Sequence, residues 1–137
     1  IAAIMESRKN ENILINCSRT TFPMEKNAMR WANYIGNRCF AILISILINK
    51  QVSDSLCGTK VFSRKFFNLM KKNGSWDSKS DPFGDFTIIF EAANNNIKIL
   101  NYPVRYYARK SGAPNISRWI DGLKLLKVCL IYLVSDI

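Results

Sequence analysis

The sequence predicts an α/β fold in which helices cover a small sheet, and three observations support this prediction. Two short β-prone segments lie far apart in the chain, at residues 12–17 and 97–107. Segments with helical periodicity fill much of the chain between and after them. Apolar residues make up 48% of the 137 residues, which is enough for a core. The predicted order is β, α, loop, α, α, β, α, with too few strands for a complete doubly wound domain.

The N-terminal part is predicted to hold one strand and one long helix. Residues 12–17 are apolar and β-prone, and residues 18–23 that follow indicate a loop. Residues 28–49 favour a helix, because apolar residues recur too steadily for a strand. The second half of this helix, residues 39–48, is apolar on all sides. That run of about ten residues is short of the roughly 20 that a membrane span needs, so we expect a buried or re-entrant helix.

The middle of the chain alternates between loops and helices. A loop around Asp54 precedes a helix that is predicted over residues 63–72. Residues 71–81 are polar and contain a glycine, which favours a surface loop. A further helix is predicted over residues 83–95, with Asp81 as its N-cap and Pro82 at the first helical position.

The C-terminal part is predicted as a strand, a loop and a last helix. Residues 97–107 alternate as a strand, and residues 110–115 form a loop with glycine and proline. Ser117 is a candidate cap for a helix that reaches about Val134. Trp119, Lys124 and Lys127 on this helix would suit the surface of an anionic membrane. Packing against a core is an interpretation that the sequence supports equally well.

Composition limits the chemistry that is available. The formal net charge of +10 favours an anionic partner such as a nucleotide, a phospholipid head group or nucleic acid. The chain has no histidine, which excludes Ser-His and Cys-His catalytic pairs and any zinc site that needs imidazole. The four cysteines are scattered without a CxxC pair, which favours reduced thiols in a cytosolic setting. The first residues resemble neither an initiator segment nor a signal peptide, so we expect the chain to begin inside a longer protein.

Asp54 is the first candidate site residue. It lies between an apolar helix and Gly58, with Lys60 and Arg64 a few residues further on. A carboxylate in this position could act as a base or orient a sugar hydroxyl, if burial or a neighbouring cation tunes its pKa. It could also cap a turn through its own backbone, and the two cations could be solvated charges at a helix start.

A second candidate is the basic segment of residues 105–118. It holds Arg105, Arg109, Lys110 and Arg118, two tyrosines and a glycine loop, and it precedes a predicted helix. Arginine forks and backbone N–H groups at a helix N-terminus are suited to binding phosphate. A basic surface loop is the simpler interpretation, and arginines among aromatic residues could also bind single-stranded nucleic acid.

The acidic residues near the predicted third helix form a third candidate. Asp81 has the structural task of a cap in this prediction. Asp85 and Glu91 are six residues apart, so they do not share a helical face as an i,i+4 pair would.

Taken in order, several short segments resemble the C-terminal half of a family 2 glycosyltransferase. This group includes dolichyl-phosphate mannose synthases and bacterial polyprenyl-phosphate sugar transferases. The resemblance covers nearly the whole chain, and an ordered series of segments carries it: residues 18–19, 27–30, Asn33, 36–37, 53–62, 83–86, 99–106, Arg109, Gly112 and 115–118.

The resemblance implies a GT-A-like, Rossmann-like fold and transfer of a sugar with inversion. Residues 1–137 would form the acceptor-side half of the domain. The donor-binding half, with its glycine-bearing first strand and its Asp-x-Asp motif, has no counterpart in the chain. The full-length enzyme would use Mg²⁺ or Mn²⁺, whose ligands are expected outside this chain. This chain alone is therefore expected to be inactive.

The resemblance also implies site residues. Asp54 matches the carboxylate near the acceptor and the donor sugar, and is the expected catalytic residue. Arg109 matches a cation that contacts the donor phosphates, and Arg19 and Arg30 match cations on the acceptor side. The other positions expected to bind substrate are Lys60, Asp85, Ser117 and Arg118.

The expected partners are a nucleotide-sugar donor, a polyprenyl-phosphate or saccharide acceptor and a membrane surface, with no nucleic acid. The expected location is the cytoplasm, at the cytoplasmic face of a membrane. The alternative hypothesis is a non-catalytic basic module that binds an anionic membrane surface or nucleic acid.

Overall fold

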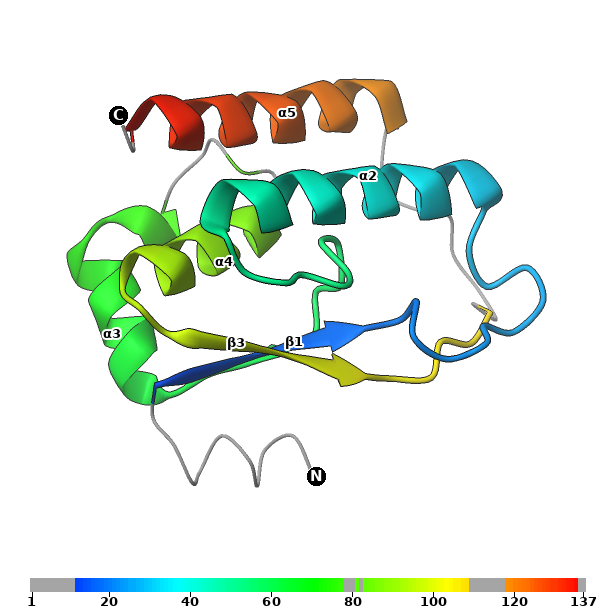
Figure 1. Cartoon of the computed structure of the whole chain (residues 1–137), viewed down its shortest axis with the longest axis horizontal. Coiled ribbons are helices and arrows are strands. Elements are labelled where there is room, and N and C mark those ends of the chain that lie inside the picture. The colour runs from blue at the N-terminus through cyan, green and yellow to red at the C-terminus, as the bar shows by residue number, and fades with distance from the viewer. Residues whose placement is uncertain (1–11, 78–80, 82, 109–117, 136–137) are drawn as a thin grey trace.

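Three strands form one small sheet with β1 in its centre (Figure 1). The computed structural model describes residues 12–77, 81, 83–108 and 118–135. The strand order is β2-β1-β3, where β1 is Ile13–Ser18, β2 is Lys60–Val61 and β3 is Lys98–Pro103. Strand β1 pairs parallel with β3 and antiparallel with β2. The carboxyl ends of β1 and β3 therefore lie at the same edge of the sheet, where α/β folds commonly place a ligand.

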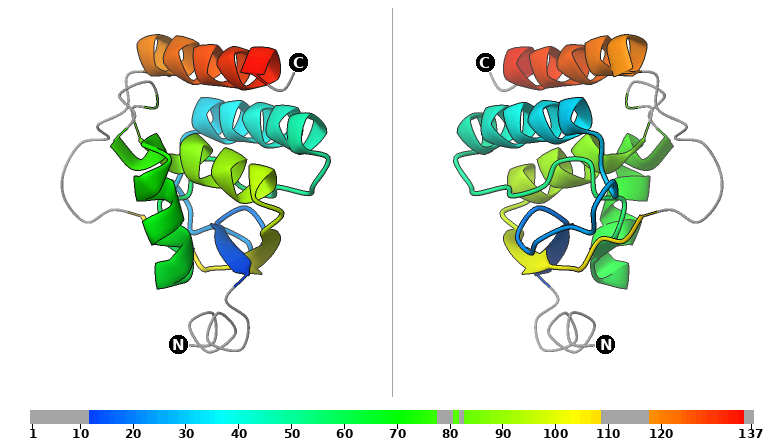
Figure 2. Two further views of the ribbon diagram at one scale, coloured as in Figure 1. Left: turned by 90° about the vertical axis from the view of Figure 1, so that its left-hand side faces the viewer. Right: turned by 90° about the vertical axis from the view of Figure 1, so that its right-hand side faces the viewer.

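The helices lie on one side of this sheet and at one end of it. Helix α4 (Asp85–Asn94) and helix α2 (Trp31–Ile48) lie over the sheet, and α5 (Arg118–Ser135) forms an outer layer on both of them (Figures 1 and 2). Helix α3 (Arg64–Lys72) and the short helix η1 (Ser75–Asp77) lie beside α4. The described residues thus form a mixed α/β fold with a small sheet covered by helices, as predicted.

The core lies between the sheet and the helices. Side chains from all four α-helices and from β1 meet there, among them Leu14, Ile44, Phe66, Ile89 and Leu125. Successive strand residues face opposite sides, so Leu14 shares its face of β1 with Asn16 and Ser18. The same face of β1 is thus apolar at its start and polar at its carboxyl end, although Asn16 and Ser18 are both fully buried.

The start of α4 differs from the prediction. Gly84 is the N-cap residue, with a φ of 72° that favours glycine, and the helix begins at Asp85 instead of at residue 83. Asp81 still satisfies the free N–H groups of the first turn, because its Oδ2 accepts from the N–H of Phe86 and of Thr87, each at 2.9 Å. Asp81 therefore caps α4 from outside the N-cap position. Pro82 lies outside the described residues.

Other boundaries differ by a few residues. Helix α2 begins at Trp31, three residues after the predicted start, and β3 ends at Pro103 instead of continuing to residue 107. Strand β2 was not predicted, and η1 lies within the predicted loop 71–81. Helix α3 was predicted correctly, and the Oγ of Ser63 caps it by accepting from the N–H of Phe66. The predicted loop 110–115 and the predicted cap Ser117 lie outside the described residues.

Candidate functional site

Asp54 lies in the loop after α2, beside the carboxyl end of β1, and its side chain is completely buried. Its two carboxylate oxygens accept five hydrogen bonds. Oδ2 accepts from the backbone N–H of Arg19 at 2.9 Å and from its Nε at 2.8 Å. Oδ1 accepts from Arg19 Nη2 at 2.9 Å, from Asn37 Nδ2 at 2.8 Å and from the N–H of Leu56 at 3.2 Å.

These contacts decide what Asp54 can do chemically. Burial alone would raise the pKa of Asp54, but the hydrogen bonds and the positive charge of Arg19, together with the Asn37 amide, outweigh it and lower the pKa below its ordinary value. A carboxylate has about four lone-pair positions, and five donors already occupy them. This arrangement suits a residue that positions Arg19 far better than one that removes a proton.

Arg19 is the cation that Asp54 positions. Its Nε and Nη2 face the two carboxylate oxygens as a fork, and the ring of Tyr106 lies 5.2 Å from its guanidinium carbon. The side chain remains 17% exposed. Within the described residues Nη1 makes no hydrogen bond, so one edge of the guanidinium is available to an anion.

The loop that begins at Arg19 is fastened to the segment after β3. The N–H of Glu25 donates to the carbonyl of Tyr106 at 3.2 Å. In return the carboxylate of Glu25 accepts from the N–H of Ala108 at 2.6 Å. The loops that follow β1 and β3 thus lie together at one edge of the sheet, which brings Arg19 close to the exposed Arg105 and Tyr107 segment.

Asn37 fixes the Asp54 loop to α2. It is buried on the inner face of the helix, and besides donating to Asp54 it accepts through Oδ1 from the N–H of Ser55 at 2.9 Å and its Oγ at 2.7 Å. The same oxygen accepts from the N–H of Leu56 at 3.1 Å. We did not predict Asn37 as a site residue, although a polar residue on the inner face of an apolar helix was a usable signal.

Two further asparagines hold the loop to the sheet, and neither was predicted as a site residue. Asn16 donates to the carbonyl of Asp54 at 2.9 Å and to Asn101 Oδ1 at 3.3 Å. Asn101 accepts from the N–H of Ser53 at 3.0 Å and donates to the carbonyl of Gln51 at 2.8 Å. Asn16 Oδ1 is buried and has no hydrogen-bond partner among the described residues. An acceptor is therefore unused beside the Asp54 loop.

Lys60 and Asp85 form a second charged pair near the first. The Lys60 side chain is 2% exposed, and its Nζ contacts Asp85 Oδ1 at 2.5 Å and the carbonyl of Cys57 at 2.7 Å. Burial raises the pKa of Asp85 above its ordinary value, although the charge and hydrogen bond of Lys60 oppose this effect. The two aspartates near this end of the sheet therefore have pKa values shifted in opposite directions.

The other predicted site residues are less well defined. Arg30 is exposed at the N-cap of α2, and it takes no part in the hydrogen bonds of Asp54 or Lys60. Arg109 and Ser117 lie outside the described residues, as does the side chain of Arg118 at the start of α5. Arg64, which the sequence places near Lys60, is exposed and lies over the ring of Phe67.

The cysteines and Glu91 have structural roles. All four cysteines are free, and only Cys39 is exposed. Burial raises the pKa of Cys17 and Cys57, and raises that of Cys129 to about 11. Glu91 accepts from Asn73, Ser75 and Asn95. In the part of the chain that the structure describes, no three histidine, cysteine or acidic residues are grouped so that they could hold a metal ion.

Comparison of the chain with protein-family models, with curated protein sequences and with solved structures gives no significant match.

Proposed function

We propose that the chain is the acceptor-side half of a family 2 glycosyltransferase domain with a GT-A-like fold, acting at the cytoplasmic face of a membrane. The observation that supports this most directly is the fork between Asp54 and Arg19 at the carboxyl end of β1. It holds a cation, whose Nη1 has no hydrogen-bond partner within the described residues, at the sheet edge where α/β folds place ligands. The resemblance of the sequence assigns acceptor binding to the same arginine.

In this proposal Arg19 binds an anionic group of the acceptor, and Asp54 keeps the guanidinium in place. A phosphate acceptor is already ionised at neutral pH and requires no base. Asp54 is a poor base, because its pKa is lowered and its oxygens are occupied. A polyprenyl-phosphate acceptor therefore fits this chemistry better than a saccharide hydroxyl does.

A saccharide acceptor would need a base from elsewhere in the site. Asp85 has a raised pKa and a second oxygen, Oδ2, that makes no hydrogen bond within the described residues. It is the better candidate for that task, with Lys60 holding its other oxygen.

The donor would bind mainly to the other half of the parent domain. Mg²⁺ or Mn²⁺ would stabilise the charge that develops on the leaving diphosphate, with ligands contributed outside this chain. Arg109 would add a cation from this chain, while Ser117 and Arg118 would contribute donors near the N-terminus of α5. This chain supplies the acceptor side and would not transfer sugar alone.

The proposal is tested in the full-length protein with a panel of nucleotide sugars and a polyprenyl-phosphate acceptor. Replacing Arg19 by Gln should raise the KM for the acceptor about tenfold or more and leave the KM for the donor unchanged. Arg64→Gln, at an exposed arginine of α3 outside the site, is the matched control. Arg109→Ala should instead weaken donor binding.

Two results would count against the proposal. Unchanged turnover in Asp54→Asn would remove Asp54 from catalysis, both as a base and as the residue that positions Arg19. Absence of transfer with every donor, together with steeply salt-dependent binding of nucleic acid, would favour the basic binding module instead.

A further inference from the structure

The outer face of α2 carries an apolar stripe that no described residue covers. Trp31, Ile35, Ile42 and Ile46 follow the spacing of one helical face, and their exposed fractions reach 77% at Trp31 and 72% at Ile46. The opposite face carries the buried residues Asn37, Ala41, Ile44 and Ile48. The helix is therefore apolar on both sides, although only one side packs against the protein.

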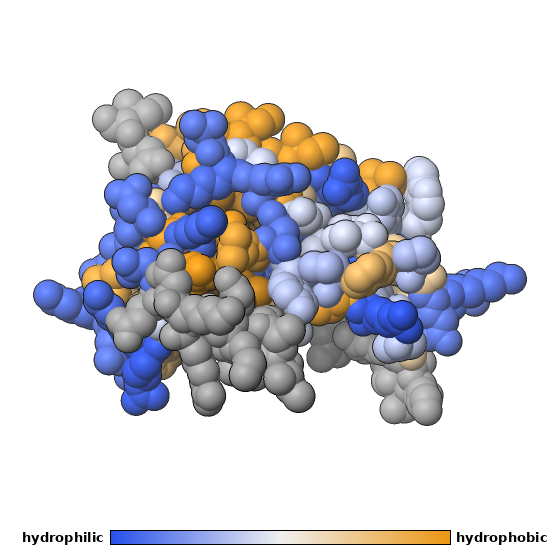
Figure 3. All heavy atoms as spheres, turned by 60° about the horizontal axis from the view of Figure 1, so that its bottom comes forward, coloured by the Kyte–Doolittle hydropathy of each residue, from blue (hydrophilic) through white to orange (hydrophobic). Residues whose placement is uncertain are grey.

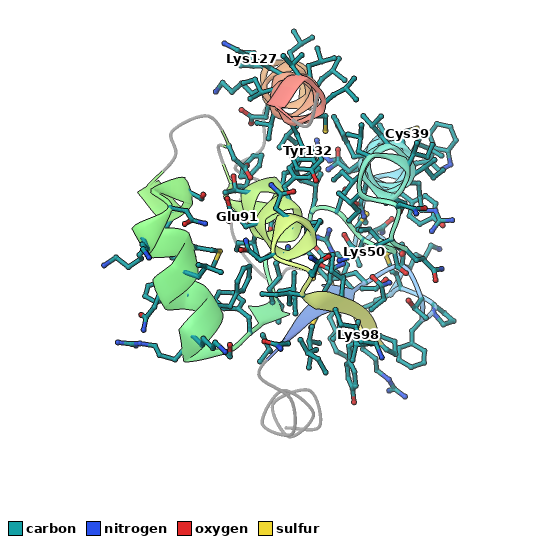
Figure 4. All side chains as sticks on the ribbon, turned by 60° about the vertical axis from the view of Figure 1, so that its left-hand side comes forward. Cys39, Lys50, Glu91, Lys98, Lys127 and Tyr132 are labelled. Atoms are coloured by element: carbon teal, nitrogen blue, oxygen red, sulfur yellow. The ribbon has the colours of Figure 1, made fainter. Side chains whose placement is uncertain are left out.

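Helix α5 presents a second apolar face next to the first. Leu125, Val128 and Cys129 are buried, and Tyr132 stacks on Phe90 of α4 with ring centroids 4.0 Å apart. The outward residues include Leu123, which is 69% exposed, and Val134, which is 72% exposed. In Figure 4 the labelled Tyr132 points toward α4, whereas Lys127 points away from the protein. Helices α2 and α5 pack against each other (Figure 2), and their exposed apolar residues together are called here the α2/α5 face.

The charges on and around the α2/α5 face are positive. Helix α2 contains no acidic residue, and Asp121, the one acid of α5, is buried and paired with Lys124. Arg38 and Lys127 are exposed among the apolar residues. An acidic side chain is thus absent from the described exposed positions of these two helices.

On the rest of the described surface basic side chains outnumber acidic ones, although Glu25 is an exposed acid. The aspartates whose side chains are described, at positions 54, 81, 85 and 121, are all buried. Most described lysines and arginines are exposed, and hydrophilic side chains cover both ends of the molecule in Figure 3, with apolar residues along its upper edge. Exposed positive side chains therefore outnumber exposed negative ones among the described residues.

We propose that the α2/α5 face binds the interface of an anionic lipid bilayer, with both helices lying in the plane of the membrane. Apolar side chains would enter the acyl boundary, while Arg38 and Lys127 would meet the lipid phosphates. A second copy of the chain fits less well, because a two-fold contact would oppose like charges from two strongly basic molecules. Nucleic acid would leave the apolar stripe without a partner.

Helix α2 lies along the bilayer in this arrangement and does not cross it. Its 18 residues have the length and hydropathy of a candidate span, a criterion that the core helix of a soluble protein also meets. However, Asn37 in its middle binds the buried Asp54 and Ser55, which fastens one side of the helix to the polar loop. A spanning orientation would carry this charged network into the hydrocarbon, at considerable cost.

Lipid binding by the α2/α5 face is tested apart from sugar transfer, with vesicles that contain neither a nucleotide sugar nor a polyprenyl phosphate. The protein is mixed with phosphatidylcholine vesicles and with vesicles that also contain phosphatidylglycerol, and binding is measured by co-flotation. We expect binding to the anionic vesicles. Two paired substitutions should each weaken binding to the anionic vesicles about tenfold or more. One pair is Ile42→Asn with Ile46→Asn on α2, and the other is Leu123→Asn with Leu130→Asn on α5.

Charge and fold are tested separately. Arg38→Gln and Lys127→Gln should each reduce binding to the anionic vesicles about fivefold. Phe22→Asn removes an exposed apolar side chain outside the two helices and should leave binding unchanged. Circular dichroism shows whether each variant is folded, and unfolded variants are replaced by the single substitution Ile46→Asn.

Three outcomes would overturn the proposal. The first is no binding to vesicles, and the second is vesicle binding that the paired apolar substitutions do not change. The third is a dimer in light scattering that those substitutions dissociate, which would show that a second copy covers the face.

Discussion

The guanidinium of Arg19 binds both carboxylate oxygens of Asp54, with Nε–Oδ2 at 2.8 Å and Nη2–Oδ1 at 2.9 Å, across 35 residues of sequence. The carboxylate is fully buried and the arginine is largely so. Removing one member of such a pair leaves the other desolvated without its counter-charge. The pair thus joins the loop after β1 to the loop after α2, and it controls the direction of the arginine.

A double-mutant cycle should show strong coupling within this pair. Asp54→Asn and Arg19→Gln should each lower the free energy of unfolding by about 3 kcal/mol, and the double variant should lose less than the sum of the two. Urea denaturation measures all four proteins. Arg38→Gln, an exposed arginine of α2, is the control and should change stability by less than about 0.5 kcal/mol. Additive losses would show that the two side chains act independently.

The stabilising effect of Asp54 should disappear in acid. Its folded pKa lies below its unfolded pKa, so its contribution is present above the unfolded value and is lost as pH falls toward the folded value. The difference in unfolding free energy between the wild type and Asp54→Asn should be constant from pH 7 to about pH 5 and should shrink below about pH 4. A difference that stays constant down to about pH 2 would contradict the lowered pKa.

Asp85 should show the opposite dependence on pH. Its folded pKa is raised, so the folded state holds the proton more tightly than the unfolded state, and stability falls as pH rises from the ordinary value through the raised one. The wild type should therefore gain stability relative to Asp85→Asn when the pH is lowered into this window. Denaturation of both proteins at several pH values, starting near neutrality, measures the effect. A wild type that loses stability relative to the variant over the same window would exclude a raised pKa.

The main elements could be predicted because their signals are local. Strand β1, helix α3 and helix α5 follow from periodicity and composition within their own residues. Strand β2 has only two residues and exists because Lys60 and Val61 pair with Asn16 and Ile15, which no local pattern reveals. The start of α4 shifted because the Asp81 side chain reaches the first-turn N–H groups from three residues before the N-cap Gly84.

The candidate site was predicted in part for the same reason. Asp54 was predicted as a candidate site residue because it is a carboxylate beside a turn glycine and cations. Arg19 was predicted as a site residue only from the resemblance to a family, and its contact with Asp54 was not predicted, because the contact depends on how two distant loops meet. Asn16 and Asn101 become site residues through the parallel register of β1 and β3, which places them opposite each other. The opposite pKa shifts of Asp54 and Asp85 likewise depend on burial and on partners that follow from the tertiary structure.

Asn37→Leu should destabilise the protein more than a substitution two residues away on the same helix. It removes a donor to Asp54 and the acceptor for the Ser55 and Leu56 N–H groups, all in a buried region. Because buried polar groups without partners are costly, we expect a loss of about 3 kcal/mol in unfolding free energy. Cys39→Leu places the same side chain on the exposed face of α2 and should change stability by less than about 0.5 kcal/mol. Urea denaturation of the two variants provides the comparison, and equal losses would show that the Asn37 network does not hold the Asp54 loop to the helix.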